Sequence, residues 1–182
     1  MVSFMELDEL ISAGLRNYEK AIELLDRGDY YDAAEKAWSA VESFRKAFLV
    51  ALGVPYQKVR TISYCLPLFG RLMRALGLKK LLRRYEWFDY KLHIMGFYER
   101  LTPEDEIELI VRRHVKLWLD RMRSVILRLS GVNISDILEI YDRAVRLKQE
   151  VLRKSSELVE INNELAKRIH AFALGARSRL TG

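Results

Sequence analysis

The chain has 182 residues, half of them hydrophobic, and its 31 basic and 25 acidic side chains give a net charge of +6. The hydrophobic fraction excludes an intrinsically disordered chain, and a single cysteine excludes a disulfide framework and a multi-cysteine zinc site. Nine glycines and three prolines are too few for an all-β sandwich with many tight turns.

The first two helices are predicted to form an antiparallel hairpin over residues 1–53. Gly28 is suited to a left-handed cap that ends the first helix, and Asp29 is suited to the N-cap of the second. Gly53-Val54-Pro55 ends the second helix. The apolar side of the second helix consists of Tyr30, Ala34, Ala37, Trp38, Val41, Phe44, Phe48 and Leu52.

Residues 56–130 are expected to form shorter helices. Pro67 is predicted to break the helical segment in residues 56–80, and a further helix is predicted over residues 79–96. Thr102 is the expected N-cap of the next helix, with Pro103 in its first helical position. We expect the apolar face of that helix to include His114, as a core histidine.

A final long helix is predicted from near Asn133 to as far as Leu174. Two rows with seven-residue spacing are apolar throughout, and polar residues lie between them. This pattern indicates a partner helix, either from the same bundle or from a second copy, and we favour a homo-oligomer, preferably a dimer. The candidate self-association residues are Ile137, Val151, Leu158, Asn162, Leu165 and Phe172.

The predicted fold class is therefore all-α, with an up-and-down helical bundle over residues 1–130 and a long C-terminal helix over residues 131–182. That helix either associates or completes the bundle. An acidic start without an apolar signal segment, and the absence of any run of about 18 apolar residues, predict a cytoplasmic protein without a membrane partner. The composition, with few amide side chains and many ionic ones, is typical of a thermophile.

Charge is distributed unevenly along the sequence. Residues 1–55 carry 6 basic and 10 acidic side chains, whereas residues 56–100 carry 10 basic and 3 acidic ones. The basic middle either pairs with the acidic N-terminal third or attracts an anion such as nucleic acid. The candidate nucleic-acid-binding residues are Lys79, Lys80, Arg83, Arg84, Arg112, Lys116 and Arg123.

One group of residues has the types needed for acid–base chemistry. Glu86, Asp89 and His93 share one face of the predicted helix, with Tyr90 beside them. The alternative interpretation is a solvated polar face with one hydrogen bond between an aspartate and the histidine. The familiar nucleotide-binding, metalloprotease and serine-hydrolase motifs are absent, so we expect no metal and no cofactor.

Two stretches carry a family resemblance. AAEKAWSAVESFRKA at residues 33–47 and LHIMGFYE at residues 92–99 resemble the archaeal PaREP family of small helical proteins, which is itself similar to the HEPN superfamily. The likeness covers roughly residues 1–130. It implies a helical bundle that is often dimeric, and many HEPN proteins are ribonucleases or RNA-binding partners.

The HEPN nuclease signature is an arginine, four to six residues of any type, and a histidine. None of the three histidines, at positions 93, 114 and 170, has an arginine at that spacing. The leading hypothesis is therefore a non-catalytic helical interaction module. The alternative is an RNA- or nucleotide-binding protein, or a ribonuclease that uses His93 without the usual motif. The identity of a protein partner is left open.

Overall fold

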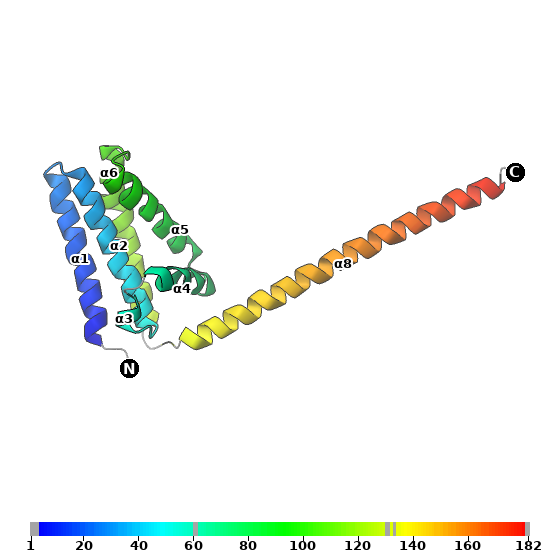
Figure 1. The fold of residues 1–182 in the computed structure, drawn as a ribbon, viewed down its shortest axis with the longest axis horizontal. Helices are drawn as coiled ribbons and strands as arrows, with labels where there is room; N and C mark the ends of the chain where they lie inside the picture. Colours follow the sequence, from blue (N-terminus) through cyan, green and yellow to red (C-terminus); the bar gives the residue numbers. More distant parts are fainter. Residues whose placement is uncertain (1–3, 60–61, 130–131, 133, 181–182) are drawn as a thin grey trace. The chain divides into compact units, whose positions relative to one another are not determined.

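The computed structural model describes residues 4–59, 62–129, 132 and 134–180, and within these ranges the side chains of residues 4, 62–64 and 168–180 lie outside the description. All regular elements of the described residues are helical, which confirms the all-α fold class (Figure 1). In chain order they are α1 (Phe4–Asp26), α2 (Tyr30–Ala51), α3 (Tyr56–Val59), α4 (Ile62–Ala75), α5 (Lys79–Phe88), η1 (Asp89–Tyr98), α6 (Glu104–Leu109), η2 (Ile110–Val115), α7 (Lys116–Leu129) and α8 (Ile134–Leu180), where η1 and η2 are π-helical.

The predicted hairpin of α1 and α2 is present, and the residues between the helices have their expected roles. Gly28 has a φ of +77°, and the Asp29 side chain accepts a hydrogen bond from the Asp32 backbone N–H at 3.4 Å. The two helices approach closely at Gly14, where an added Cβ would lie 2.6 Å from the Phe44 ring. Glycine at this position therefore lets α1 pack on α2 along its length.

Helix α2 is the centre of the bundle. It packs against α1, η1 and α7 and also contacts α3, α6 and η2. Its alanines Ala33, Ala34, Ala37, Ala40 and Ala47 are fully buried, because small side chains allow neighbouring helices to come close. Figure 1 shows α2 between α1 and the later helices of the bundle.

The prediction that Pro67 breaks a helix was wrong. Pro67 lies inside α4, in its second turn. A proline inside a helix costs roughly 3 kcal/mol, whereas each large apolar side chain that becomes buried contributes roughly 1.5–3 kcal/mol. Phe69, Leu72 and Met73 of the same helix are each at most 1% exposed, and their burial outweighs the cost of the proline.

Thr102 was predicted to be the N-cap of α6, and this prediction was wrong. Pro103 occupies the cap position of α6, and no side-chain hydrogen bond caps the helix. Thr102 is instead 2% exposed, and its hydroxyl donates to the Lys91 carbonyl at 2.9 Å. The Thr102 hydroxyl therefore provides a hydrogen-bond donor for a carbonyl of η1 and attaches the loop before α6 to that helix.

The helix predicted over residues 79–96 is not one regular α-helix. It is α-helical as α5 and continues as the π-helix η1. At Gly96 an added Cβ would lie 2.9 Å from the Lys91 carbonyl oxygen and 3.3 Å from the Ala34 Cβ. The wider π-turn and the glycine together bring the backbone of η1 against α2.

The chain divides into two compact units, Met1–Leu138 and Glu139–Gly182. The second unit consists of the larger part of α8, a single helix of 47 residues. At a rise of 1.5 Å per residue, α8 is about 70 Å long. In the part of the chain that the structure describes, no helix combines the length and the apolar character needed to cross a bilayer.

Candidate functional site

A joint between α2 and η1 brings the two stretches at residues 33–47 and 92–99 into contact. Gly96 packs on Ala34, and His93 Nδ1 lies 3.0 Å from the Glu35 carboxylate. The His93 ring stacks on Trp38 with a centroid separation of 5.4 Å, and Tyr98 meets it edge-on at 4.9 Å. The two sequence segments therefore form one packed unit in the fold.

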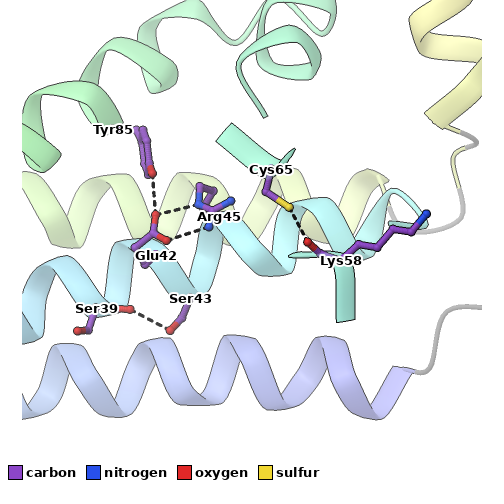
Figure 2. Close-up of polar contacts among 7 residues, drawn as sticks. All are labelled: Ser39, Glu42, Ser43, Arg45, Lys58, Cys65 and Tyr85. Atoms are coloured by element: carbon purple, nitrogen blue, oxygen red, sulfur yellow. Dashed lines mark hydrogen bonds and ion pairs between the residues drawn. The ribbon is translucent and has the colours of Figure 1, made fainter. Parts of the chain in front are cut away.

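A buried ion pair lies farther along α2. Arg45 is 0% exposed and donates to both carboxylate oxygens of Glu42, at 2.8 and 2.9 Å. Tyr85 of α5 donates to the same carboxylate at 2.6 Å (Figure 2). Burial alone would raise the pKa of Glu42, but the hydrogen bonds and charge of Arg45 hold it below its usual value. Burial and the Glu42 carboxylate raise the pKa of Tyr85.

The Arg45 guanidinium is not fully satisfied. Its Nη1 is buried and has no hydrogen-bond partner among the residues that the structure describes. An unsatisfied buried donor is costly, but the bidentate pair with Glu42 compensates most of the charge. Both members of the pair belong to α2, and Tyr85 of α5 donates to the Glu42 carboxylate. We therefore interpret the three residues together as a structural connection between α2 and α5.

Among the described residues, none of the predicted acid–base partners Glu86, Asp89 and Tyr90 forms a hydrogen bond or an ion pair with His93. Its carboxylate contact comes from Glu35, which is 58 positions away in the sequence, and not from Asp89 or Glu86 on its own helix. Asp89 is half-buried, and its pKa is raised above its usual value, mainly by burial. The nearby His93 opposes this shift, whereas the Glu42 carboxylate adds to it. Glu86 and Tyr90 are exposed. The sequence could not reveal Glu35 as the partner because the contact depends on how α2 and η1 pack.

A basic groove runs between α5 and the segment formed by η2 and α7. We define the basic groove by the residues around a cavity of about 450 Å³: Lys80, Leu81, Arg83, Arg84, Trp87, His114, Leu117, Trp118 and Arg121. Its volume lies in the range of small-ligand sites. A second cavity of about 370 Å³ shares Leu81 and Arg121 with it and adds Arg128.

The basic groove combines positive charge with aromatic rings. The Arg84 guanidinium lies 4.8 Å from the centroid of the Trp87 ring, and His114 meets Trp87 edge-on at 5.6 Å. Burial lowers the pKa of His114, and the charges of Arg84 and Arg113 lower it further. Among the described residues no carboxylate lies within ion-pair distance of Lys80, Arg83, Arg84 or Arg121. These cations are therefore available to an anion.

The predicted nucleic-acid-binding residues separate in the structure. Lys80, Arg83 and Arg84 line the basic groove, and Lys79 and Arg123 are exposed outside its lining. Arg112 is held by Asp26 and Glu108, and Lys116 by Asp120 at 2.6 Å. Arg121, Trp87 and His114 complete the groove. The sequence places Arg121 in the same set of basic residues and Trp87 near it as a ring for base stacking, whereas His114 was predicted to be a core histidine.

The apolar rows of α8 are exposed. Val151, Leu158 and Leu165 are 66%, 61% and 54% exposed, although they are large apolar side chains. Ile137 is half-buried against the bundle core, and Asn162 is exposed. Phe172 lies outside the residues whose side chains the structure describes. The exposed rows extend through the middle of the helix and form a surface without a partner among the described residues.

The fold and these surfaces define a class of protein: a small all-helical bundle continued by a long helix with exposed apolar rows. In the described part of the chain, no three His, Cys, Asp or Glu side chains gather to hold a metal ion. The chain belongs to the archaeal PaREP1/PaREP8 family, whose family model matches residues 9–118. The match contains both stretches of the α2–η1 joint. We found no match among curated proteins and none among solved structures.

Proposed function

We propose that this protein is a non-catalytic helical interaction module that self-associates through α8. The bundle supplies a stable body, and α8 supplies the association surface. The proposal rests above all on one observation, the exposure of Leu147, Val151, Leu158, Ile161 and Leu165 at 54–66% along one helix. Exposed apolar surface of this extent marks an interaction site in a folded protein.

Residue chemistry at the α2–η1 joint supports a non-catalytic role. His93 Nδ1 is in hydrogen-bond contact with Glu35, and one face of the His93 ring stacks on Trp38. One ring nitrogen and one ring face are therefore already used in contacts within the fold. Glu42 and Arg45 neutralise each other in the bundle interior. These groups stabilise the packing of α2 against α5 and η1.

The test compares two substitutions that add the same charge at different faces of α8. Leu158→Asp places a carboxylate in an apolar row, whereas Gln149→Asp places one outside the rows. Light scattering after size exclusion measures the mass of each variant and of the unmodified chain. We expect an oligomer for the unmodified chain and for Q149D, and a monomer for L158D. A monomeric unmodified chain, or an unaffected L158D, contradicts the proposal.

A second candidate function is binding of single-stranded RNA in the basic groove. The observation that favours it is the combination of four cations without carboxylate partners and the Trp87 ring in one cavity. Cations bind phosphates, and aromatic rings stack on unpaired bases. These residues come from α5, η2 and α7, so the groove is formed between packed helices.

Fluorescence anisotropy of a labelled short RNA across a salt series tests this second function. We expect affinity to fall log-linearly with salt concentration, with the slope reporting the number of phosphates neutralised. Arg84→Ala and Arg121→Ala should each weaken binding and reduce the slope by roughly one phosphate contact. Arg112→Ala is the matched control, because Arg112 is held by Asp26 and Glu108 outside the groove. Absence of binding at low salt, or equal loss in all three variants, contradicts groove binding.

A further inference from the structure

The length of α8 restricts which helix can cover its apolar rows. The helix has 47 residues, whereas α1, the next longest of the described helices, has 23. At 1.5 Å per residue these lengths are about 70 Å and about 35 Å. A short helix would leave about half of α8 uncovered, so another helix of similar length is needed. A second copy of this chain supplies one.

The sequence of α8 has an internal symmetry about Ser155. A polar row, consisting of Lys148, Ser155 and Asn162, follows the middle of the apolar face. One apolar row on one side contains Ala144, Val151, Leu158 and Leu165, and another on the other side contains Val145, Leu152, Val159 and Ala166. All these residues except the half-buried Val145 are exposed.

We infer that α8 pairs antiparallel with α8 of a second copy, about a two-fold axis at Ser155. The inference rests on the proposed self-association and adds its orientation and register. A two-fold axis perpendicular to the pair places each apolar row beside the same row of the partner, running in the opposite direction. Val151 then packs beside the partner's Leu158, and Leu152 beside the partner's Val159.

The sizes of the paired residues complement one another farther from the axis. Ala144 lies beside the partner's Leu165, so a small side chain faces a large one. In the polar row Ser155 meets the partner's Ser155, and Lys148 meets the partner's Asn162. The Asn162 amide oxygen accepts a hydrogen bond from the lysine ammonium in this register. A polar pair of this kind fixes register in packed helices.

A parallel pairing in register is disfavoured by charge. It would place Lys148 against the partner's Lys148 in the middle of the interface, where like charges repel. Residues 134–142, at the start of α8, contain three acidic residues and no basic one. A parallel pairing would also bring this acidic segment beside the same segment of the partner. The antiparallel arrangement instead places that segment level with residues 168–176 of the partner helix, which contain one basic residue and no acidic one.

Cysteine cross-linking of the full chain tests the orientation. The single native cysteine, Cys65, is buried and its thiol donates to the Lys58 carbonyl, so C65S keeps a donor and provides the background. S155C, K148C and N162C are each oxidised alone, and K148C is also oxidised together with N162C. Sedimentation velocity of each reduced variant establishes whether the chains associate.

The antiparallel register predicts a disulfide-linked dimer for S155C alone and for the mixture of K148C with N162C. It predicts no cross-link for K148C alone or for N162C alone. In this register the same residue in the two copies is separated by 14 positions along the helix axis, about 21 Å, which is far beyond the reach of a disulfide. If the chains associate and K148C and N162C each form a disulfide with the same residue of the second copy, the helices are parallel. This result overturns the inference but leaves the proposed self-association in place. Associated chains without any of these cross-links also overturn it. Chains that sediment as monomers overturn the proposed self-association and the inference with it.

Discussion

Helices α2 and α8 have similar apolar periodicity but opposite surroundings. In α2 the large side chains of Phe44 and Phe48 are 0% exposed, whereas in α8 Val151 and Leu158 are more than half exposed. The α2 side chains are covered by α1, η1 and α7 of the same chain. A periodic apolar face therefore shows that a helix needs a partner, and only the structure shows whether the chain itself provides one.

This comparison separates two kinds of stability. Substitutions around α2 should change the free energy of unfolding of a single chain, whereas substitutions in the rows of α8 should change association. The same contrast applies to ion pairs. Arg45 and Glu42 are 0% and 19% exposed, and Arg153 and Glu157 of α8 are 66% and 52% exposed.

The largest predicted effect concerns the buried pair. Glu42→Gln leaves the Arg45 guanidinium buried without its counter-charge and removes the negatively charged acceptor of Tyr85. We expect the free energy of unfolding to fall by roughly 3–5 kcal/mol, as when one partner of a buried pair is removed. Urea denaturation followed by circular dichroism measures this change.

The matched control is the exposed pair in α8. Glu157→Gln removes the carboxylate that Arg153 contacts at 2.7 Å, but solvent screens this pair. We expect a change of at most about 1 kcal/mol. Equal losses in E42Q and E157Q would show that the difference in burial has no energetic consequence.

A smaller effect is expected at the α2–η1 joint. Gly96→Ala adds a Cβ 2.9 Å from the Lys91 carbonyl oxygen, so the backbone has to shift. We expect a loss of about 1–3 kcal/mol in the free energy of unfolding, typical of overpacking. Gly70→Ala is the control, because its Cβ would meet only the flexible end of Arg74 at 3.2 Å. A G96A protein as stable as G70A would mean that the joint tolerates a wider separation of η1 and α2.

For the apolar rows of α8 we predict little change in bundle stability. Val151→Asp should leave the free energy of unfolding of the bundle within about 0.5 kcal/mol, as for surface substitutions, at a concentration at which the chains are monomeric. Near-ultraviolet circular dichroism follows the bundle specifically, because all three tryptophans, Trp38, Trp87 and Trp118, lie in it. A loss of several kcal/mol would show that α8 stabilises the bundle of its own chain.

The smallest predicted effect is a pH dependence from His114. Its pKa is lowered in the folded protein, so the unfolded chain binds more protons between the folded value and 6.5. The stability linked to His114 is therefore present above pH 6.5 and is lost as the pH falls through this window. His114→Gln should flatten that part of the stability profile. An identical slope in the variant between pH 5 and 7 would assign the dependence to another group.

Local sequence signals predicted the helical hairpin well. Gly28 and Asp29 determine the turn through backbone conformation and a side-chain cap, which depend on adjacent residues alone. The start of the long helix was also placed within a residue, because its periodicity is sustained. Local rules were wrong at Pro67 and Thr102, where burial in the tertiary structure outweighed proline strain and helix capping.

The candidate sites could be predicted only in part. Lys80, Arg83 and Arg84 were predicted from their basic cluster, whereas the place of His114 in the groove was missed because it was predicted to be a core residue. Arg112 and Lys116 were included because they are basic, and only the structure shows that acidic residues hold them. Likewise, the contact between His93 and Glu35 depends on the packing of η1 against α2.

Hydrogen exchange measured at several protein concentrations tests most directly whether α8 depends on a second copy while the bundle stands alone. Residues 143–167 of α8 should exchange faster on dilution, because dissociation exposes the helix and lets it open. The amides of α2 should exchange at the same rate at every concentration. Protection of residues 143–167 that does not change with concentration would contradict the account, because α8 would then be stable without a partner copy.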